Sequence, residues 1–178
     1  MIAPMKASPL QTLKRKIVSQ KEAVRIASKL RKRGLVIVTT NGTFDLLHSG
    51  HVDSLVRAKS LGDVLMVGVN SDASVRRYKG PTRPIVEAKE RALMVAALEC
   101  VDYVFIFSSD TPIPWIHTLR PHIHAKGSDR AIEQIVEKTA VDHVGGKIIL
   151  LPHTGRRSTT KLIERIRNGQ RSKKPESR

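Results

Sequence analysis

The sequence has little cysteine, few aromatic residues and no long apolar run. Its single cysteine, Cys100, excludes an intrachain disulfide and fits a reducing compartment. The apolar neighbours Leu98 and Val101 favour a small buried residue there rather than a reactive thiol. No apolar run approaches the roughly 20 residues that span a bilayer, and residues 1–20 lack the apolar middle of a secretory signal. We therefore expect a cytoplasmic protein with no membrane segment.

Acidic residues are also scarce, at 16 against 32 lysines and arginines, which gives a net charge of +16. The excess lies at the chain ends, because residues 35–155 hold thirteen charges of each sign. Residues 1–34 hold ten basic and one acidic residue, and residues 156–178 hold nine and two. Aromatic residues, which stack on bases, make up only 3%. Nucleic acid is therefore not favoured as the main ligand, and a basic nucleic-acid-binding protein stays as the alternative from a different class.

Hydrophobic periodicity predicts strands that alternate with helices. Such alternation indicates βαβ units, so we expect a single α/β domain with one doubly wound, mostly parallel sheet. This domain is expected over residues 16–168, with a flexible basic N-terminus at residues 1–15 and a basic tail at 169–178. The expected strands are residues 35–39, 64–69, 103–107, 123–125 and 147–151, and the expected helices are 20–33, 52–61, 86–99, 112–119, 131–143 and 158–167.

The most informative segment is TNGTFDLLHSGH at residues 40–51. It joins a predicted strand to a predicted helix, so His48 and His51 fall where free N–H groups and the helix dipole attract anions. Two imidazoles at such a place indicate phosphate handling. An H-x-x-H pair can also be half of a zinc site, but no cysteine cluster and no third ligand at a suitable spacing accompany it. We therefore predict no metal-ligating residues.

Polar residues also follow two other predicted strands. Asn70-Ser71-Asp72 follows the second strand and Lys126-Gly127 follows the fourth. Doubly wound sheets bind ligands beyond the carboxyl ends of their strands. We therefore expect these groups and the two histidines to converge on one edge of the sheet.

Residues 42–51 resemble the GxFDxxHxGH motif of the cytidylyltransferase-like nucleotidyltransferases, and residues 157–160 are similar to the late STT motif of that superfamily. Residues 16–167 further resemble the adenylyltransferase domain of the bacterial ADP-heptose synthases. The blocks that carry this likeness are residues 70–77, 79–81, 91–104, 110–112, 126–127 and 158–160.

The resemblance implies a Rossmann-like fold and an enzyme that joins ATP to a sugar 1-phosphate, D-glycero-β-D-manno-heptose 1-phosphate, with release of pyrophosphate. It also implies Mg²⁺ carried with ATP, and a homodimer. Relatives with other phosphorylated acceptors, such as glycerol phosphate or flavin mononucleotide, share the first and last motifs, so a cytidylyltransferase or adenylyltransferase for another acceptor stays open. The choice of ATP over CTP comes from the resemblance alone.

The resemblance also assigns roles to individual residues. Lys79 has a plain alternative as a solvated side chain in a mobile loop, and Arg91 has one as a helix-surface ion pair with Glu87. Asp45 is expected to hold its loop. Arg156 stands where relatives usually carry glycine, which adds a cation near the expected triphosphate. The expected catalytic residues are His48, His51, Lys79 and Arg91, and the expected nucleotide-binding residues are Gly42, Thr43, Phe44, Asp72, Lys126, Gly127, Ser158 and Thr159.

Overall fold

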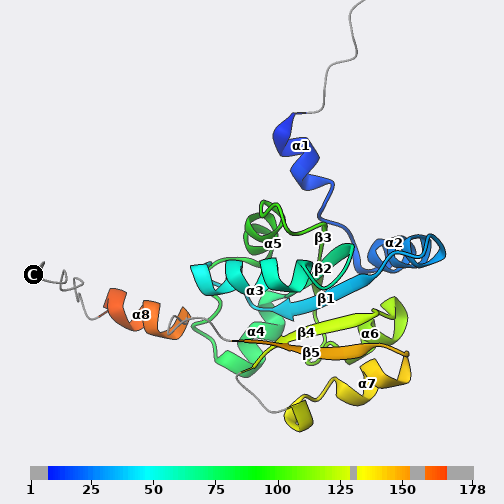
Figure 1. The fold of residues 1–178 in the computed structure, drawn as a ribbon. Coiled ribbons are helices and arrows are strands. Elements are labelled where there is room, and N and C mark those ends of the chain that lie inside the picture. Colours follow the sequence, from blue (N-terminus) through cyan, green and yellow to red (C-terminus); the bar gives the residue numbers. More distant parts are fainter. Residues whose placement is uncertain (1–7, 129–131, 153–158, 168–178) are drawn as a thin grey trace, which may run out of the picture.

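Five parallel strands form one sheet in the order β3-β2-β1-β4-β5 (Figure 1). The computed structural model describes residues 8–128, 132–152 and 159–167. All five predicted strands are present, and the parallel sheet confirms the expected fold class. The first strand begins and ends later than predicted, so the sheet extends into the polar segment at Asn41 and Gly42. The strands are β1 (Ile37–Gly42), β2 (Val64–Asn70), β3 (Tyr103–Phe107), β4 (Ile123–Gly127) and β5 (Lys147–Leu151).

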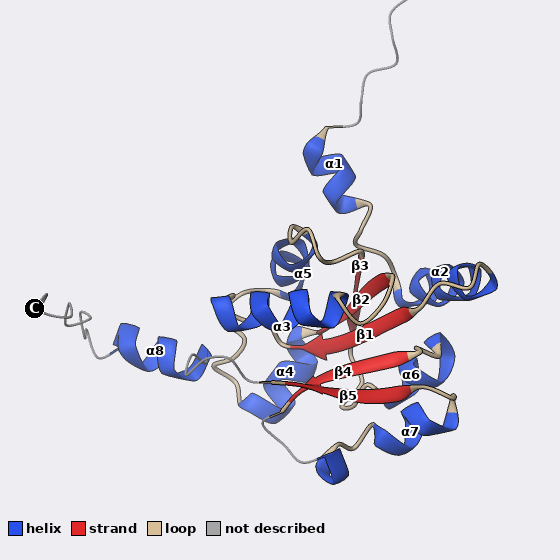
Figure 2. Ribbon diagram, in the orientation of Figure 1, coloured by secondary structure: helices blue, strands red, loops and turns tan. Residues whose placement is uncertain are grey.

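Helices cover both faces of this sheet (Figure 2). On one face α3 and α5 pack against a core that includes Val38, Val67 and Leu55. On the other face α2, α6 and α7 pack against a core that includes Met66 and Trp115. The described helices are α1 (Pro9–Lys14), α2 (Gln20–Lys32), α3 (Ser49–Lys59), α4 (Asp72–Lys79), α5 (Ala88–Ala96), α6 (Ile113–Leu119), α7 (Lys138–His143) and α8 (Thr159–Arg167).

The chain changes faces of the sheet between β1 and β4. The connection that leaves β1 carries α3 on one face, whereas the connections into and out of β4 carry α6 and α7 on the other. Because neighbouring strands β1 and β4 send their chains in opposite directions, a crevice opens beyond their carboxyl ends. The functional residues predicted from the sequence follow these same strand ends.

Both cores consist of closely packed, buried side chains. All seven residues of β2 are buried, as expected for a strand covered on both faces. Trp115 is fully buried and meets the edges of the Phe105 and Phe107 rings at 5.2 and 5.9 Å. Cys100, expected to be buried, is partly buried against the α3 side of the core, and this burial raises the pKa of its thiol.

The local structure differs from the expectation at three places. The N-terminal segment expected to be flexible contains α1, which begins where Ser8 and Gln11 form a capping box. Helix α4 was missed because Val75 is its only buried apolar residue, which leaves little periodicity. The helix expected over residues 131–143 consists of a 3₁₀ turn at Ile132–Gln134 and the shorter α7.

None of the described helices is long and apolar enough to cross a membrane. Helix α1 projects away from the sheet, and α8 lies at the opposite side of the view from α2 (Figure 1).

Candidate active site

The segment between β1 and α3 presents two stacked imidazoles. His48 is the N-cap residue of α3 and His51 lies in its first turn. Their rings are 3.8 Å apart between centroids, with planes 20° from parallel. The buried ring of Phe44 packs against His51, with the ring centroids 5.3 Å apart. The histidines predicted from the motif therefore meet at the beginning of an eleven-residue helix.

The backbone around Phe44 is unusual. Phe44 adopts φ +52°, in the left-handed region that non-glycine residues rarely occupy. A Cβ atom at Gly42 would approach the Phe44 ring to 3.1 Å, so a side chain there must displace the ring that supports His51. Gly42 thus has a packing role in addition to the close phosphate approach suggested by the sequence.

His51 is electrically neutral over most of the pH range. Burial lowers its pKa to about 4, and the nearby positive charges of His48 and Lys79 act in the same direction. Its Nδ1 atom is buried and has no hydrogen-bond partner among the described residues. A bound anion would reverse these influences, because negative charge beside an imidazole favours the protonated form.

Asp45 fixes the loop that faces the histidine motif. Its carboxylate accepts hydrogen bonds from Arg83 Nε at 2.6 Å and from the backbone N–H groups of Ile85 and Val86 at 2.8 and 3.0 Å. Burial of this carboxyl would raise its pKa, but the hydrogen bonds from Val86, Arg83 and Ile85 outweigh burial and lower it. Asp45 holds the loop, as expected from the sequence.

Arg91 is fully buried and is not a helix-surface partner of Glu87, which corrects that alternative. Its Nη2 atom donates to Asp72 Oδ1 at 2.6 Å and to Asn70 O at 2.8 Å. Its Nε donates to Val86 O at 2.7 Å, and Nη1 donates to the carbonyl of Thr43. One guanidinium therefore joins the histidine loop, the end of β2, the start of α4 and the loop before α5.

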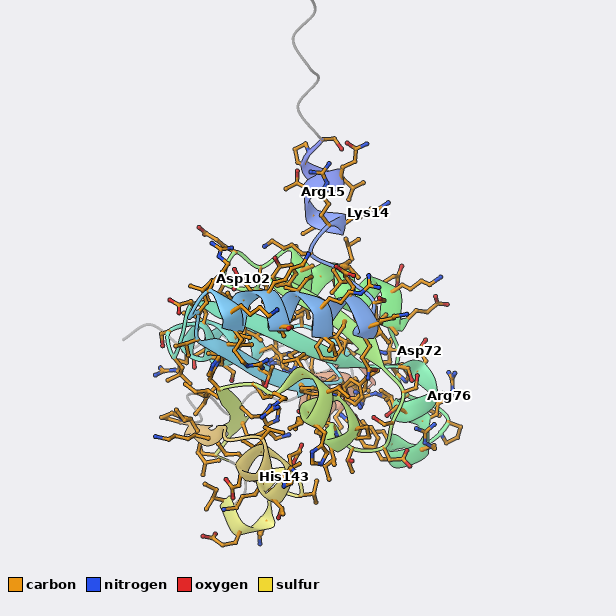
Figure 3. The ribbon with its side chains drawn as sticks, turned by 90° about the vertical axis from the view of Figure 1, so that its right-hand side faces the viewer. Lys14, Arg15, Asp72, Arg76, Asp102 and His143 are labelled. Carbon is orange, nitrogen blue, oxygen red and sulfur yellow. The ribbon has the colours of Figure 1, made fainter. Side chains whose placement is uncertain are left out.

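Asp72 uses its side chain on Arg91, while Ser71 caps α4 by accepting the N–H of Ser74. The alternative of Asp72 as a turn cap is therefore not what the structure shows. Arg76 lies one turn further along α4 and is exposed at the surface (Figure 3).

Lys79 is the last residue of α4 and not part of a loop, which corrects its predicted placement, while its side chain is in contact with solvent as the plain alternative expected. Partial burial lowers the pKa of its ammonium group, and the cations Arg83 and Arg91 add to this effect against an opposing influence of Asp45. The preceding residue, Tyr78, hydrogen-bonds through its hydroxyl to Thr43 Oγ1. The end of α4 is thereby attached to the histidine loop.

Lys126 and Gly127 are the last two residues of β4, which runs two residues further than predicted. The Lys126 ammonium donates to Glu137 Oε1 at 2.8 Å and to Asn41 Oδ1 at 3.2 Å. Glu137 is only 4% exposed, directly before α7. Glu137 lies in no motif, and Asn41, although part of the 40–51 segment, was assigned no role from the sequence, because only the fold brings these two residues to Lys126.

Two adjoining cavities open at this edge of the sheet. The smaller, of about 330 Å³, lies beside α3 and includes His51 and Phe44 in its wall. The larger, of about 470 Å³, lies toward the starts of α6 and α7 and includes Lys79, Lys126 and Glu137. The two share Asn41, Gly42 and Gly127. His51, Asn70, Lys126 and Gly127 therefore converge as expected from the sequence. His48, Ser71 and Asp72 line neither cavity, and Asp72 faces Arg91.

The last predicted motif is only partly visible. Ser158 and Arg156 lie outside the described residues. Thr159 begins α8, and its hydroxyl donates to the carbonyl of Leu46 at 3.5 Å. The start of α8 therefore contacts the histidine loop.

Known proteins resemble this chain in sequence. The cytidylyltransferase-like family model matches residues 39–165. The bifunctional protein HldE of Syntrophotalea carbinolica is 53% identical over 136 residues, which are 76% of this chain and 28% of that protein. The protein of the same name from Caulobacter vibrioides is 45% identical over 151 residues, 85% of this chain and 31% of that protein. The chain thus spans less than a third of the length of these curated relatives.

Solved structures share the fold. The lipopolysaccharide core biosynthesis protein from Thermoplasma volcanium has a TM-score of 0.57 and 25% identity, and covers 69% of this chain and 99% of its own. The pantoate-beta-alanine ligase from Francisella tularensis, at 17% identity and a TM-score of 0.57, covers 81% of this chain and 68% of its own. This second likeness concerns the fold alone. The family match over the sheet, the histidine loop and α8 shows that the chain belongs to the cytidylyltransferase-like family of nucleotidyltransferases.

Proposed function

We propose that the protein transfers an adenylyl group from ATP to a sugar 1-phosphate, D-glycero-β-D-manno-heptose 1-phosphate, and releases pyrophosphate. The observation that carries this proposal is the stacked pair His48 and His51, at the start of α3 and beside the crevice between β1 and β4. Helix N-termini at such crevices bind phosphates. The heptose acceptor is supported by the resemblance to ADP-heptose synthases and by the relatives named HldE.

The proposed transfer is a single in-line displacement at phosphorus. An anionic oxygen of the acceptor phosphate attacks the α-phosphorus of ATP and forms the new P–O bond. The bond from the α-phosphorus to its bridging oxygen breaks, and the electron pair leaves with pyrophosphate. No base is needed, because the attacking oxygen is already deprotonated. Catalysis therefore consists of positioning and charge stabilisation, which we assign to His48, His51 and Lys79.

The remaining predicted residues support this chemistry in different ways. Gly42, Thr43 and Phe44 would present backbone groups to phosphate, and Ser158 and Thr159 would do so from the start of α8. Arg91 is proposed to position the histidine loop, since its guanidinium is buried and bonded to four protein oxygens.

We also propose that Mg²⁺ arrives with ATP. Within residues 8–128, 132–152 and 159–167, no three histidine, cysteine or carboxylate side chains are grouped to hold a metal ion. Phosphate oxygens would supply ligands, and the ion would neutralise part of the triphosphate charge.

A panel of nucleotides and acceptors tests the function. Pyrophosphate release is measured with ATP or CTP against heptose 1-phosphate, glycerol 3-phosphate and flavin mononucleotide. The proposal expects turnover with ATP and heptose 1-phosphate above every other pair. Turnover with CTP and glycerol 3-phosphate, and none with ATP and heptose 1-phosphate, would reject it.

The same preparation tests the other two expectations. Light scattering should give twice the mass of the chain if the homodimer implied by the resemblance forms. Deletion of residues 170–178 separates the enzyme from a basic nucleic-acid binder. If no pair gives turnover and salt-sensitive RNA binding disappears with the tail, the binder is the better description.

A further inference from the structure

The two adjoining cavities differ in the charges of their walls. The smaller cavity beside α3 has no carboxylate among its described lining residues, and its wall includes His51 from the first turn of α3. The larger cavity contains two lysines and two carboxylates, so its charges balance. These are Lys79, Lys126, Asp110 and Glu137. The electrostatic potential is therefore more favourable for a triphosphate in the smaller cavity than in the larger one.

Glu137 is the least expected of these charges, because a carboxylate is costly to bury unless it is paired. It is 4% exposed and accepts a hydrogen bond from Lys126 at 2.8 Å. The same ammonium is held by Asn41 at the end of β1. Glu137 thus offsets the charge of Lys126 and makes this lysine a positioned donor rather than an unopposed phosphate-binding cation.

Beside the apolar residues Pro112, Ile135 and Val136, the wall of the larger cavity has uncharged polar side chains that suit hydroxyl groups. Gln134, Asn70 and Thr111 contribute amide and hydroxyl groups to its wall. Carboxylates and amides accept hydrogen bonds from hydroxyls, and amides and ammonium groups donate to them. Tyr78 is its one aromatic lining residue in the described chain, and the Tyr78 hydroxyl is bonded to Thr43. The wall therefore favours a polyhydroxylated ligand over a flat aromatic one.

We propose that the larger cavity binds the hydroxyl-bearing part of the acceptor and that Glu137 is a specificity-determining residue for it. This inference rests on the proposed function, because it divides the two substrates of that reaction between the two cavities. The acceptor phosphate would lie at the shared rim formed by Asn41, Gly42 and Gly127, next to the triphosphate in the smaller cavity.

Direct binding measurements on Glu137→Gln test the inference. The matched control is Glu133→Gln, four residues earlier on the same segment and exposed. Isothermal titration is made with heptose 1-phosphate, inorganic phosphate and α,β-methylene ATP, none of which requires turnover. Glu137→Gln should weaken the binding of heptose 1-phosphate about tenfold or more. A site built to hydrogen-bond a ligand loses much of its affinity for that ligand when one charged partner is removed. The affinities for inorganic phosphate and α,β-methylene ATP should stay within about twofold of those of the unmodified protein. Glu133→Gln should change none of the three affinities.

A second variant keeps the test decisive if Glu137→Gln does not fold. Asp110 lies elsewhere in the cavity wall, with an exposed side chain paired to Arg77 at 2.5 Å. Asp110→Asn should weaken the binding of heptose 1-phosphate several-fold and leave the affinity for α,β-methylene ATP unchanged. Unchanged affinity for the sugar phosphate in this variant would then overturn the inference.

The outcomes separate the inference from the proposed function. Equal losses of affinity for heptose 1-phosphate and α,β-methylene ATP in Glu137→Gln would overturn the subsite. Affinities in Glu137→Gln identical to those in Glu133→Gln would overturn it as well. Binding of α,β-methylene ATP without any binding of heptose 1-phosphate to the unmodified protein would overturn it as well. Glu137-dependent binding of heptose 1-phosphate, with no pyrophosphate release from ATP, would reject the proposed function and support the subsite.

Discussion

The cavity beside α3 and the cavity toward α6 and α7 share a rim but are built in different ways. The first takes most of its wall from one continuous segment, residues 40–55. The second collects side chains from the ends of β1, β2 and β4, from the end of α4 and from the segments before α6 and α7. A local motif therefore produces one half of the site, and the topology of the sheet produces the other.

This difference extends to charge. The α3 cavity has the His51 imidazole in the first turn of α3 and no carboxylate among its described lining residues, whereas the larger cavity holds two lysines and two carboxylates, of which Lys126 and Glu137 are paired. The first arrangement suits a polyanion, and the second suits a ligand with many hydroxyl groups. The comparison makes distinct predictions for the two regions.

The largest effect is expected in the α3 cavity. His48→Ala and His51→Ala should each lower turnover by roughly 10²–10³-fold, as does loss of a donor that stabilises transition-state charge in other enzymes. The free energy of unfolding should change by no more than about 1 kcal/mol, since the helix and its core remain. Steady-state assays and urea unfolding measure both quantities.

His117→Ala is the control, because His117 is an exposed histidine on α6. Near-normal turnover in both motif variants would contradict the assignment of the α3 cavity to the triphosphate.

The next effect concerns the residue that joins the two regions. Arg91→Lys keeps the charge but loses most of the four hydrogen bonds to Thr43, Asn70, Asp72 and Val86. Because buried acceptors are then left unpaired, the free energy of unfolding should fall by about 2–3 kcal/mol. Arg57→Lys, in an exposed pair with Asp53, should cost less than about 0.5 kcal/mol. Equal losses in the two variants would mean that Arg91 does not hold the loops together.

The sequence predicted the α3 side well, because strand, loop and helix follow one another and the motif lies within them. All five strands were found, since each is a short apolar run between polar turns. Helix α4 was missed because Val75 alone among its apolar residues is buried. Its absence from the prediction is why Lys79 was placed in a loop.

The larger cavity was predictable at Gly42, Lys79, Lys126 and Gly127, but not at Glu137. Glu137 meets Lys126 across eleven residues and Asn41 meets it across 85. Arg91 was found, but its burial was not, because the acceptors that surround it come from segments far apart in the sequence. Contacts of this kind depend on the completed sheet and have no local signature.

A pH effect sharpens the description of the α3 cavity. The pKa of His51 falls from an ordinary 6.5 to about 4 in the folded protein. Between those values the unfolded chain binds a proton that the folded protein does not, so stability should decrease as the pH falls from about 6.5 toward 4. His51→Ala should remove that part of the decrease, as followed by urea unfolding at several pH values. Parallel stability curves for the two proteins would contradict a lowered pKa.

The smallest effect is expected at the contact between the two regions. Tyr78→Phe removes the hydroxyl that bonds to Thr43 and should cost about 1 kcal/mol in transition-state stabilisation, a several-fold loss of kcat/KM. Tyr103→Phe, in β3 at the far edge of the sheet, is the control and should leave kcat/KM unchanged. A Tyr78→Phe enzyme as active as the control would show that α4 need not be attached to the histidine loop.

The central claim is that the α-phosphorus of ATP, and no other, moves to the acceptor. Turnover with heptose 1-phosphate is measured in parallel with ATP labelled at the α-phosphate and ATP labelled at the γ-phosphate. The account predicts that the α label appears in the nucleotide sugar and that the γ label appears only in pyrophosphate. Transfer of the γ label to the sugar, or release of the α label as free AMP, would contradict it.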